Sequence, residues 1–359
     1  MKMRFRLVSL SAPIIALTIS FGLSSLILLV IGKDPYETFK IMFEYGIRGK
    51  SIVSIINRSI PLYISAIAVA VGFKMGLFNI GVEGQYLMGS LIAAYIGAQF
   101  SVITPLHILF IIIVAVATSS LWAAIAGYLK VEKGIHEVIS TIMLNYIGTG
   151  LIAYSLTTIF DEPNSNYDLP RTKELPETGK MPALNKFFNL EDLQDLHGFL
   201  VIALMVGIFY YWLVWKTTLG FDLRITGSNP TAAKFSGINP KRLVIVAMIT
   251  SGGFAGLVGL GPLLGYFHRF TIDFPTGLGF AGIGVALLGR NHPFGMAVGA
   301  LLFAFLQRSA QILDLNDVPK EIEQMMQAFI LLIVVVFYEV IRRFIVKQQI
   351  KDASKRNDE

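Results

Sequence analysis

The side chains best suited to binding a polar solute lie in or beside long apolar segments of this chain. Asn79, Glu83 and Gln85 fall in the glycine-rich stretch 75–85, which separates two apolar segments. They could hydrogen-bond a solute, because glycine-rich interruptions at membrane depth are tolerated only where backbone lines a cavity or is buried in protein. The same residues also fit an ordinary cytoplasmic turn with a solvated Glu83. The sequence leaves both interpretations open.

A second polar pair, Asn145 and Tyr146, lies in the middle of the apolar segment 138–160. Polar groups inside a membrane span usually face a cavity or another helix. Asn145 therefore either faces the path of a solute or hydrogen-bonds a neighbouring helix, as amides do in membranes. Arg308 and Glu339 lie near the ends of other apolar segments, where long charged side chains can reach the interface.

Patterns for catalysis and metal binding are missing from the sequence. The chain has no cysteine, its five histidines are scattered, and it contains no HExxH pair or carboxylate cluster. It also lacks the GxxxxGK[ST] motif of ATP-binding loops. The letters GxGxxG at 277–282 lie in an apolar segment, without the βαβ unit of a dinucleotide site. We expect no catalytic residue, no bound metal and no cofactor, and a membrane-embedded enzyme is the least favoured class.

Composition places these residues in a membrane protein. Of the 359 residues, 54% are hydrophobic and 15% are charged, against roughly 25% charged in soluble domains. Because a spanning helix needs about 20 apolar residues, we predict an all-α polytopic membrane protein with about ten transmembrane helices, some broken or re-entrant. The strongest segments are 7–31, 106–128, 138–160, 199–215, 243–266 and 323–346; weaker ones are 52–72, 85–100 and 294–313, and 277–289 is short.

The distribution of charge predicts the orientation. With ten crossings and a cytoplasmic N-terminus, 18 of the 30 lysines and arginines lie in segments assigned to the inside. The longest outer loop, 161–197, carries eight acidic and four basic residues. Because cytoplasmic loops of membrane proteins are enriched in basic residues, both termini are expected in the cytoplasm. The same topology explains the net charge of +6, so no nucleic acid is expected as a partner.

Segment 32–50 predicts a short helix on the outer face. Asp34 and Pro35 are suited to the N-cap and the first position of a helix. Phe39, Met42 and Phe43 recur at helical spacing behind them, as in a helix that lies along a membrane surface.

The internal loop 216–242 predicts a docking surface for another protein. Ser228 or Asn229 can cap a short helix that starts at Pro230 and ends at Gly237. The alanines of this helix would allow close approach of a partner, and Phe235 would widen its apolar face. A basic loop held against anionic lipid headgroups is the alternative. The residues expected to dock are Arg224, Asn229, Pro230, Ala232, Ala233, Lys234 and Gly237.

Four stretches in this order resemble permeases of the branched-chain amino acid/ribose-type ABC importers, and most of all the nucleoside branch of that superfamily. They are GLFNIGVEGQYLMGS (76–90), EVISTIMLNYI (137–147), LRITGSNPTAAKFSGINPKR (223–242) and GFAGIGVALLGRNHPFG (279–295). The resemblance covers about residues 10 to 345. It implies two inverted halves of about five helices each, with a second helix break between Gly279 and Gly289.

The resemblance also implies partners and roles. A cytoplasmic ABC ATPase would drive transport, a second, similar permease would complete the membrane unit, and an external lipoprotein would deliver the substrate across the bacterial-type plasma membrane. Residues 216–242 would hold the coupling helix. Asn79, Glu83 and Gln85 would lie near the substrate pathway, with Asn145 and Tyr146 facing it. Residues 1–346 would form the permease domain in the lipid bilayer, and 347–359 a polar cytoplasmic tail.

The exact cargo stays open on these grounds. Nucleosides are favoured, while ribose, another simple sugar or a branched-chain amino acid would use the same machinery. An ion-driven secondary transporter is less favoured, because such proteins usually carry acidic residues deep in their spans. Only Glu83 and Glu339 come close to that position in this sequence.

Overall fold

A computed structural model describes residues 2–160, 169–185, 195–334, 336 and 340. Side chains of 1–14 and 16 lie outside the description, as do Glu339 and the tail 347–359. Throughout the described ranges the regular elements are helices, and two isolated β-bridges lie in the segments between them. The predicted all-α class is therefore confirmed. The chain divides into two compact units, Gly49–Ala304 and the remaining residues at both ends.

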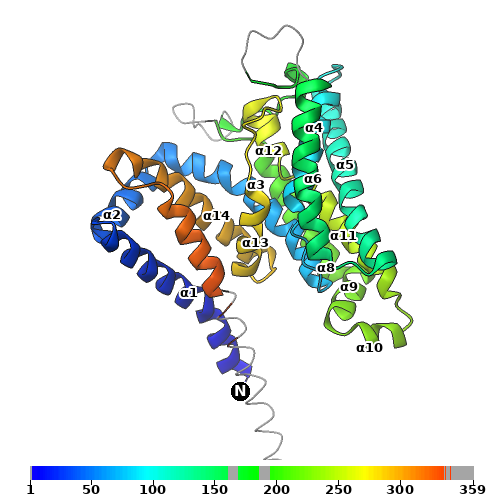
Figure 1. The fold of residues 1–359 in the computed structure, drawn as a ribbon, viewed down its shortest axis with the longest axis horizontal. Helices are drawn as coiled ribbons and strands as arrows, with labels where there is room; N and C mark the ends of the chain where they lie inside the picture. Colours follow the sequence, from blue (N-terminus) through cyan, green and yellow to red (C-terminus); the bar gives the residue numbers. More distant parts are fainter. Residues whose placement is uncertain (1, 161–168, 186–194, 335, 337–339, 341–359) are drawn as a thin grey trace, which may run out of the picture. The chain divides into compact units, whose positions relative to one another are not determined.

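The larger unit is a bundle of helices (Figure 1). The loop of residues 169–185, which is predicted to face outward and is called the outer loop below, lies at one end of this bundle. Helices α9 and α10 lie at the other end. The helices are α3 (Gly49–Lys74), α4 (Val82–Gly97), α5 (Thr104–Lys133), α6 (Glu137–Thr158), η1 (Glu177–Gly179), α8 (Phe199–Lys216), α9 (Thr218–Ser228), α10 (Pro230–Phe235), α11 (Pro240–Gly256), α12 (Leu260–Pro262), η2 (Leu263–Phe267), α13 (Leu278–Leu288) and the first part of α14 (Pro293–Ser309).

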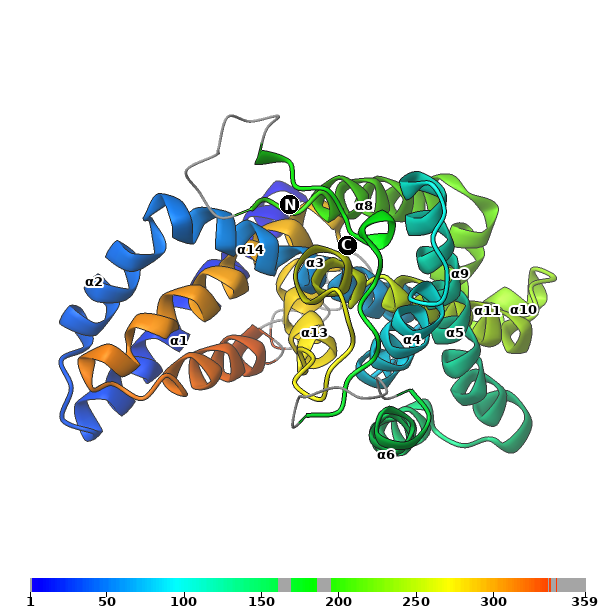
Figure 2. The ribbon, with the colours of Figure 1, turned by 90° about the horizontal axis from the view of Figure 1, so that it is seen from above.

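Helix α3 forms the centre of this bundle. It packs against α11, α13 and α8 and lies among them when viewed from above (Figure 2). From Ile64 to Gly72 its sequence is apolar or small on every side, which is typical of a helix buried all round, and residues 66–71 are fully buried. Helices α5 and α11 pack closely because α11 carries glycine at the contact. A Cβ on Gly256 would lie 2.6 Å from the carbonyl oxygen of Ala115.

The number of membrane spans agrees only in part with the expected ten. The described residues contain six helices that are long and apolar enough to cross a membrane, or seven if a bent pair counts as one span. Helix α13 has 11 residues and, at about 1.5 Å per residue, is too short to cross alone. The expectation of broken segments agrees with the non-helical stretches before α4 and before α13. The second break was expected between Gly279 and Gly289, but residues 279–288 are helical in α13 and the break lies before them, at 268–277. Ten crossings and two inverted halves stay predictions.

The smaller unit contains the two ends of the chain. Its α1 (Lys2–Val30) and α2 (Pro35–Gly46) make the bent pair, with an angle of 117° between Leu17–Val30 and α2. The Asp34 side chain accepts a hydrogen bond from Tyr36 N at 2.8 Å, which confirms the predicted cap and start of α2. The unit also holds the end of α14, η3 (Ala310–Ile312), η4 (Asp314–Asn316) and the helix Ile322–Val334.

The predicted apolar face of α2 is divided in the structure. Met42 is buried, Phe39 is half-buried and Phe43 is exposed. The ring of Phe43 lies 6.3 Å from that of Phe305, so its exposure is partial. The position of α2 on the outer face stays a prediction.

Candidate functional site

The break between α3 and α4 is held by side-chain amides. Asn79 is 1% exposed and pairs with Gln85 in both directions: each amide nitrogen donates to the other amide oxygen at 3.0 Å. Asn79 also donates to Ser251 Oγ at 2.8 Å and accepts from Gly81 N at 3.0 Å. Because buried polar groups need partners, this network stabilises the break, and both amides use their hydrogen-bonding capacity within the protein.

Glu83, in the first turn of α4, reaches the start of a distant helix. Its carboxylate accepts hydrogen bonds from Gly277 N at 2.6 Å and Gly279 N at 2.8 Å, and Tyr86 Oη lies 3.0 Å away. Glu83 is buried, and a buried carboxylate requires such donors. The turn predicted as one alternative would have left Glu83 solvated, and that interpretation is wrong.

The glycines of the GxGxxG letters have a packing role here. Gly277 has φ +84° at the N-cap of α13, a backbone conformation that glycine adopts without strain. A Cβ on Gly279 would lie 2.5 Å from Glu83 N, and one on Gly282 would lie 2.6 Å from the Cβ of Ser65 in α3. The pattern therefore marks close contacts of α13 with α4 and α3.

Asn145 and Tyr146 point in different directions from α6. Asn145 Oδ1 accepts from Gly84 N at 2.9 Å, and Asn145 Nδ2 donates to the Ile80 carbonyl oxygen at 3.0 Å. Tyr146 is 73% exposed. The structure therefore brings Asn145 to the same break as the residues of α4 but leaves Tyr146 outside it. The contacts of Asn145 favour the interhelical alternative, and the substrate role of all five residues stays a prediction.

Two further residues near these sites were missed by sequence reasoning. Ser251 in α11 links Asn79 to the Ala68 carbonyl oxygen, to which it donates at 2.6 Å. Tyr154 is 60% exposed. Tyr154 follows Tyr146 by eight positions and therefore lies on the same face of the helix, so the spacing could have revealed it. Ser251 carries no comparable signal, because one serine in an apolar helix is ordinary.

Glu137 holds the start of α6 against the same break. It accepts hydrogen bonds from Lys130 Nζ and, at 3.3 Å, from Phe78 N. This ion pair is mostly buried, and it connects the end of α5, the start of α6 and the break before α4. Among the side chains that the structure describes, no three His, Asp or Glu residues gather as metal ligands would.

The short helix α10 has the predicted caps at both ends. Asn229 Oδ1 accepts from Ala232 N at 3.0 Å, and Pro230 is the first helical residue. At the other end Gly237 has φ +79°, and its N–H donates to the Lys234 carbonyl oxygen at 3.1 Å. This is a helix stop that favours glycine, so the predicted bounds are confirmed.

The side chains of α10 divide between the protein and its surface. Ala233 is fully buried, whereas Ala232 and Lys234 are exposed and Phe235 is 90% exposed. The small apolar face expected of this helix is therefore split, because Ala233 packs inward while Phe235 projects. Figure 1 shows α10 extending from the end of the bundle next to α9. An exposed phenylalanine on a capped helix suits contact with another protein.

Helix α9 connects this surface to the break before α4. Gly227 packs directly on the backbone at the end of α3, where an added Cβ would lie 2.7 Å from the carbonyl carbon of Met75. On the same side Lys74 Nζ lies 4.9 Å from the centre of the Trp215 ring. Arg224 Nε donates to the Gly220 carbonyl oxygen within α9 at 3.3 Å. The C-terminal end of α3 and helix α9 are thus one packed structure.

The outer loop lies along the segment before α13. Thr172 N donates to the Phe270 carbonyl oxygen at 2.9 Å, and Leu175 N donates to that of His268 at 2.8 Å. Glu174 accepts from Lys180 Nζ at 2.9 Å and pairs with Arg269. The hydrogen bond from Lys180 holds the pKa of Glu174 below its usual value. The described part of this loop therefore packs on the protein by backbone bonds and charge pairs.

Two histidines near this loop have lowered pKa values. Burial is the larger cause for both His197 and His268, and the positive charge of Lys180 adds to the effect at His268. Both rings are therefore held in the neutral form more strongly than a free histidine.

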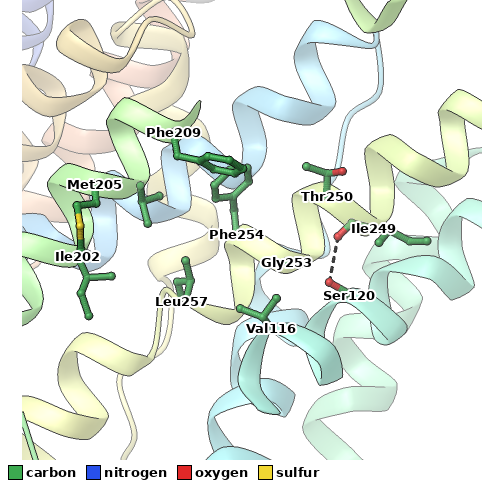
Figure 3. Close-up of a pocket in the computed structure, with 11 residues that line it drawn as sticks. Val116, Ser120, Ile202, Met205, Phe209, Ile249, Thr250, Gly253, Phe254 and Leu257 are labelled. Atoms are coloured by element: carbon green, nitrogen blue, oxygen red, sulfur yellow. Dashed lines mark hydrogen bonds between the residues drawn. The ribbon is translucent and has the colours of Figure 1, made fainter. Parts of the chain in front are cut away.

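An apolar cavity of about 430 Å³ lies between α5, α8 and α11 (Figure 3). Its two hydroxyls are occupied within the protein: Ser120 Oγ donates to the Ile249 carbonyl oxygen at 3.2 Å, and Thr250 Oγ1 to that of Val246 at 2.7 Å. Both hydroxyl hydrogens are therefore used within the protein, and the rest of the lining is apolar, which suits an apolar group better than a hydrophilic solute. The other lining residues are Val116, Ile202, Met205, Val206, Phe209, Gly253, Phe254 and Leu257.

Comparison with known proteins gives matches that cover most of the chain. Residues 51–335 match the family described as branched-chain amino acid transport system, permease component. The chain is 33% identical over 341 residues to the guanosine ABC transporter permease protein NupP of Bacillus subtilis, covering 93% of this chain and 95% of that protein. It is 32% identical to the nucleoside ABC transporter permease protein NupB of Lactococcus lactis, covering 90% of each. It is 26% identical to the glucose ABC transporter permease protein TsgB13 of Haloferax volcanii, covering 90% of this chain and 86% of that protein.

Proposed function

The chain belongs to the family of branched-chain amino acid transport system permease components, and from this premise we propose that it is the membrane-spanning subunit of an ATP-driven importer of nucleosides. The observation that carries the proposal is similarity over nearly the whole length to permeases named for guanosine and for nucleosides. The multi-pass helical architecture supports it.

The drive would come from a separate ABC ATPase bound at α10. Support comes from the two caps of this helix, from exposed Phe235, and from the contact of Gly227 with the end of α3. A push on α10 would pass through α9 to the break before α4. In this proposal α10 and both termini would lie in the cytoplasm. The surface would comprise Arg224, Asn229, Pro230, Ala232, Ala233, Lys234 and Gly237.

The substrate would pass along the exposed face of α6. Tyr146 and Tyr154 project from the same side of this helix. A phenol that faced hydrocarbon would lack a hydrogen-bond partner, which is costly. A second permease subunit and a water-filled path between the two chains would satisfy it. Aromatic rings also suit the cargo, because nucleobases stack on them.

Uptake measurements test the cargo and the energy source together. We expect cells that produce this chain with its partner subunits to take up labelled guanosine, and we expect unlabelled inosine to compete. ATP depletion should abolish the uptake. Uptake that survives ATP depletion but collapses with an uncoupler would instead identify an ion-driven transporter.

A simple sugar is the second candidate cargo, because the chain also resembles a permease named for glucose. Competition of labelled guanosine uptake by excess glucose or ribose would favour this alternative. Competition by leucine would favour a branched-chain amino acid. A lack of competition by all three, with competition by inosine, supports the nucleoside.

The face of α6 can be tested separately. Replacing Tyr146 by Ala should raise the KM for guanosine about tenfold, in line with the loss of one base–aromatic stacking contact. Leu121→Ala is a matched control, because Leu121 in α5 is exposed to the same degree. Equal KM values for the two variants would contradict the placement of the path at α6.

The external partner would be a substrate-binding lipoprotein. It would meet the outer end of the bundle, where residues 169–185 pack beside 264–271. Copurification of this chain with an ATPase, a second permease and such a lipoprotein in mild detergent would support all three partners.

A further inference from the structure

We propose that Glu83 is a positioning residue that joins the two broken segments of the bundle, so that the start of α4 and the start of α13 move as one body. This goes beyond the transport function proposed above, because it assigns a mechanical role to one carboxylate. The role follows from which atoms occupy its oxygens.

Glu83 uses both carboxylate oxygens to cap the start of α13. Oε1 accepts from Gly277 N and Oε2 from Gly279 N, at 2.6 and 2.8 Å. The first N–H groups of a helix have no partner inside that helix, and a carboxylate there also meets the positive end of the helix dipole. The cap comes from a different helix, because Glu83 lies 194 positions from Gly277 and 196 from Gly279 in the sequence. The carboxylate therefore acts as a crosslink.

Tyr86 adds a second connection between the same two segments. Its hydroxyl oxygen lies 3.0 Å from Glu83 Oε1 and 2.8 Å from the Pro275 carbonyl oxygen. The ring is fully buried in α4. The segment that leads into α13 is thus bonded to α4 at Pro275, Gly277 and Gly279.

The glycines of α13 allow this crosslink to form. A side chain at Gly279 would collide with the backbone of Glu83, and one at Gly282 would collide with Ser65 of α3. Helix α13 therefore lies flat against both α3 and α4. Separation of α13 from α4 would leave a carboxylate and two N–H groups without partners in a buried place, which is unfavourable.

The crosslink extends a chain of contacts that starts at the docking end of the bundle. Gly227 packs on the backbone at residues 74–76, and the break that follows is held by Asn79. Glu83 comes directly after this break. Movement at α9 would therefore reach α13 through backbone contacts and through the hydrogen bonds of the buried Asn79 and Glu83 side chains.

The substitution Glu83→Gln tests the crosslink with little change in shape. An amide has one oxygen, so whichever way it is oriented one of the two glycine N–H groups faces an NH₂ donor. Losing one hydrogen bond to a charged group should shift the ratio of joined to separated segments about tenfold to hundredfold. Because the chain has no cysteine, two introduced cysteines can report that ratio without further changes.

The measurement uses spin labels at Phe280→Cys in α13 and Met143→Cys in α6, both exposed. Helix α6 is bonded to the start of α4 through Asn145. The labelled full chain in lipid nanodiscs should give one narrow distribution of label-to-label distances. The labelled Glu83→Gln variant should show a second population at a longer distance. Glu132→Gln, which changes an exposed glutamate at the end of α5, should leave the distribution narrow.

A second variant keeps the test decisive if Glu83→Gln does not fold. Gly279→Ala forces the two segments apart by its added methyl group and should also produce the longer distance. An unchanged, narrow distribution in Gly279→Ala, or in a folded Glu83→Gln protein, overturns the proposal. The experiment needs neither substrate nor ATP, so its failure is distinct from a failure of the proposed function.

A transport readout separates positioning from mere structural support. This readout rests on the proposed function. In the assembled complex, Glu83→Gln should lower guanosine uptake per ATP hydrolysed about tenfold while the KM for guanosine and the amount of bound ATPase stay unchanged. If the variant lowers only the amount of assembled complex, and uptake per ATP is normal, Glu83 is structural and the positioning role is refuted.

Discussion

Two asparagines show how differently the same side chain is used in two regions of this molecule. Asn79, in the break before α4, and Asn229, at the start of α10, both accept a hydrogen bond from a nearby backbone N–H at 3.0 Å. Asn79 is buried and has further partners in Gln85 and Ser251, whereas Asn229 is exposed. In the buried region the polar groups hydrogen-bond one another, and in the exposed region an apolar side chain, Phe235, projects from the surface.

Polar residues in this chain therefore do not mark contact surfaces by themselves. The amides at the break satisfy one another, so changing them should affect stability first. Helix α10 is capped by its own residues, so changes of its exposed side chains should affect binding first. Substitutions in the two regions should therefore separate a loss of stability from a loss of binding.

Asn79→Ala should cause the largest loss of stability. It leaves Gly81 N–H and the Gln85 amide without partners in a buried place, and each unsatisfied group costs about 1–3 kcal/mol. We expect the free energy of unfolding to fall by about 3 kcal/mol, seen as earlier thermal unfolding in detergent. A variant as stable as the unsubstituted chain would show that water replaces the amide and that the break is open.

Phe235→Ala should weaken binding of the ATPase without loss of stability. The side chain is 90% exposed, so its removal should change the free energy of unfolding by less than about 0.5 kcal/mol. A buried aromatic at an interface contributes about 2 kcal/mol, or roughly thirtyfold in affinity. Titration of the purified ATPase measures this. Phe221→Ala, an exposed phenylalanine in α9, is the control, and an equal loss of affinity there would remove the special role of α10.

Asn229→Ala should have a smaller effect on the same binding. Loss of an N-cap costs about 1 kcal/mol of helix stability, which corresponds to about fivefold weaker ATPase binding. The matched control is Asn239→Ala, because Asn239 caps the long helix α11 with the same kind of bond. Because packing holds α11 in place, the affinity of the Asn239→Ala variant for the ATPase should be unchanged. Equal effects of both changes would mean that the caps act only on general stability.

Acidification should loosen the outer loop, the smallest of these effects. The pKa values of His197 and His268 are lowered in the fold by burial. Their contribution to stability is therefore complete above the unfolded value of about 6.5 and is lost as pH falls below it toward the folded values. Glu174 has a lowered pKa as well, so its contribution is lost only at more acidic pH, as the carboxylate is protonated.

Hydrogen exchange at Leu175 N, which bonds to the His268 carbonyl oxygen, reports this loosening. Exchange corrected for its intrinsic pH dependence should become faster below about pH 6.5. The amide of Gly84, bonded to Asn145 at the break, should show no such change. If both amides respond equally, the loss is global and the outer loop is no independent region.

The helix caps and bounds could be predicted because they depend on residues close in sequence. Asp34 with Pro35 and Asn229 with Pro230 form the expected N-caps, and Gly237 the expected stop. Composition was equally informative about the all-α membrane architecture. The exposure of Phe235 and the burial of Ala233 could not be predicted, because a six-residue helix has too few turns to show a periodic pattern.

The contacts of the candidate site needed the folded structure. The sequence singled out Asn79, Glu83, Gln85 and Asn145 as polar groups in apolar surroundings, and the structure gathers all four at the break before α4. Their partners could not be predicted. Ser251 lies 172 positions from Asn79, and no local pattern relates the two.

Features that depend on neighbouring residues could be derived without the fold. They are the apolar segments long enough to cross a bilayer, the caps of α2 and α10, and the family of the chain. The folded arrangement was needed to show that the carboxylate of Glu83 binds the N–H groups of α13 while Tyr146 is exposed. The reason is physical. A buried polar group takes whichever donors the packing of distant helices brings within about 3 Å, and that choice is made across the bundle rather than along the chain.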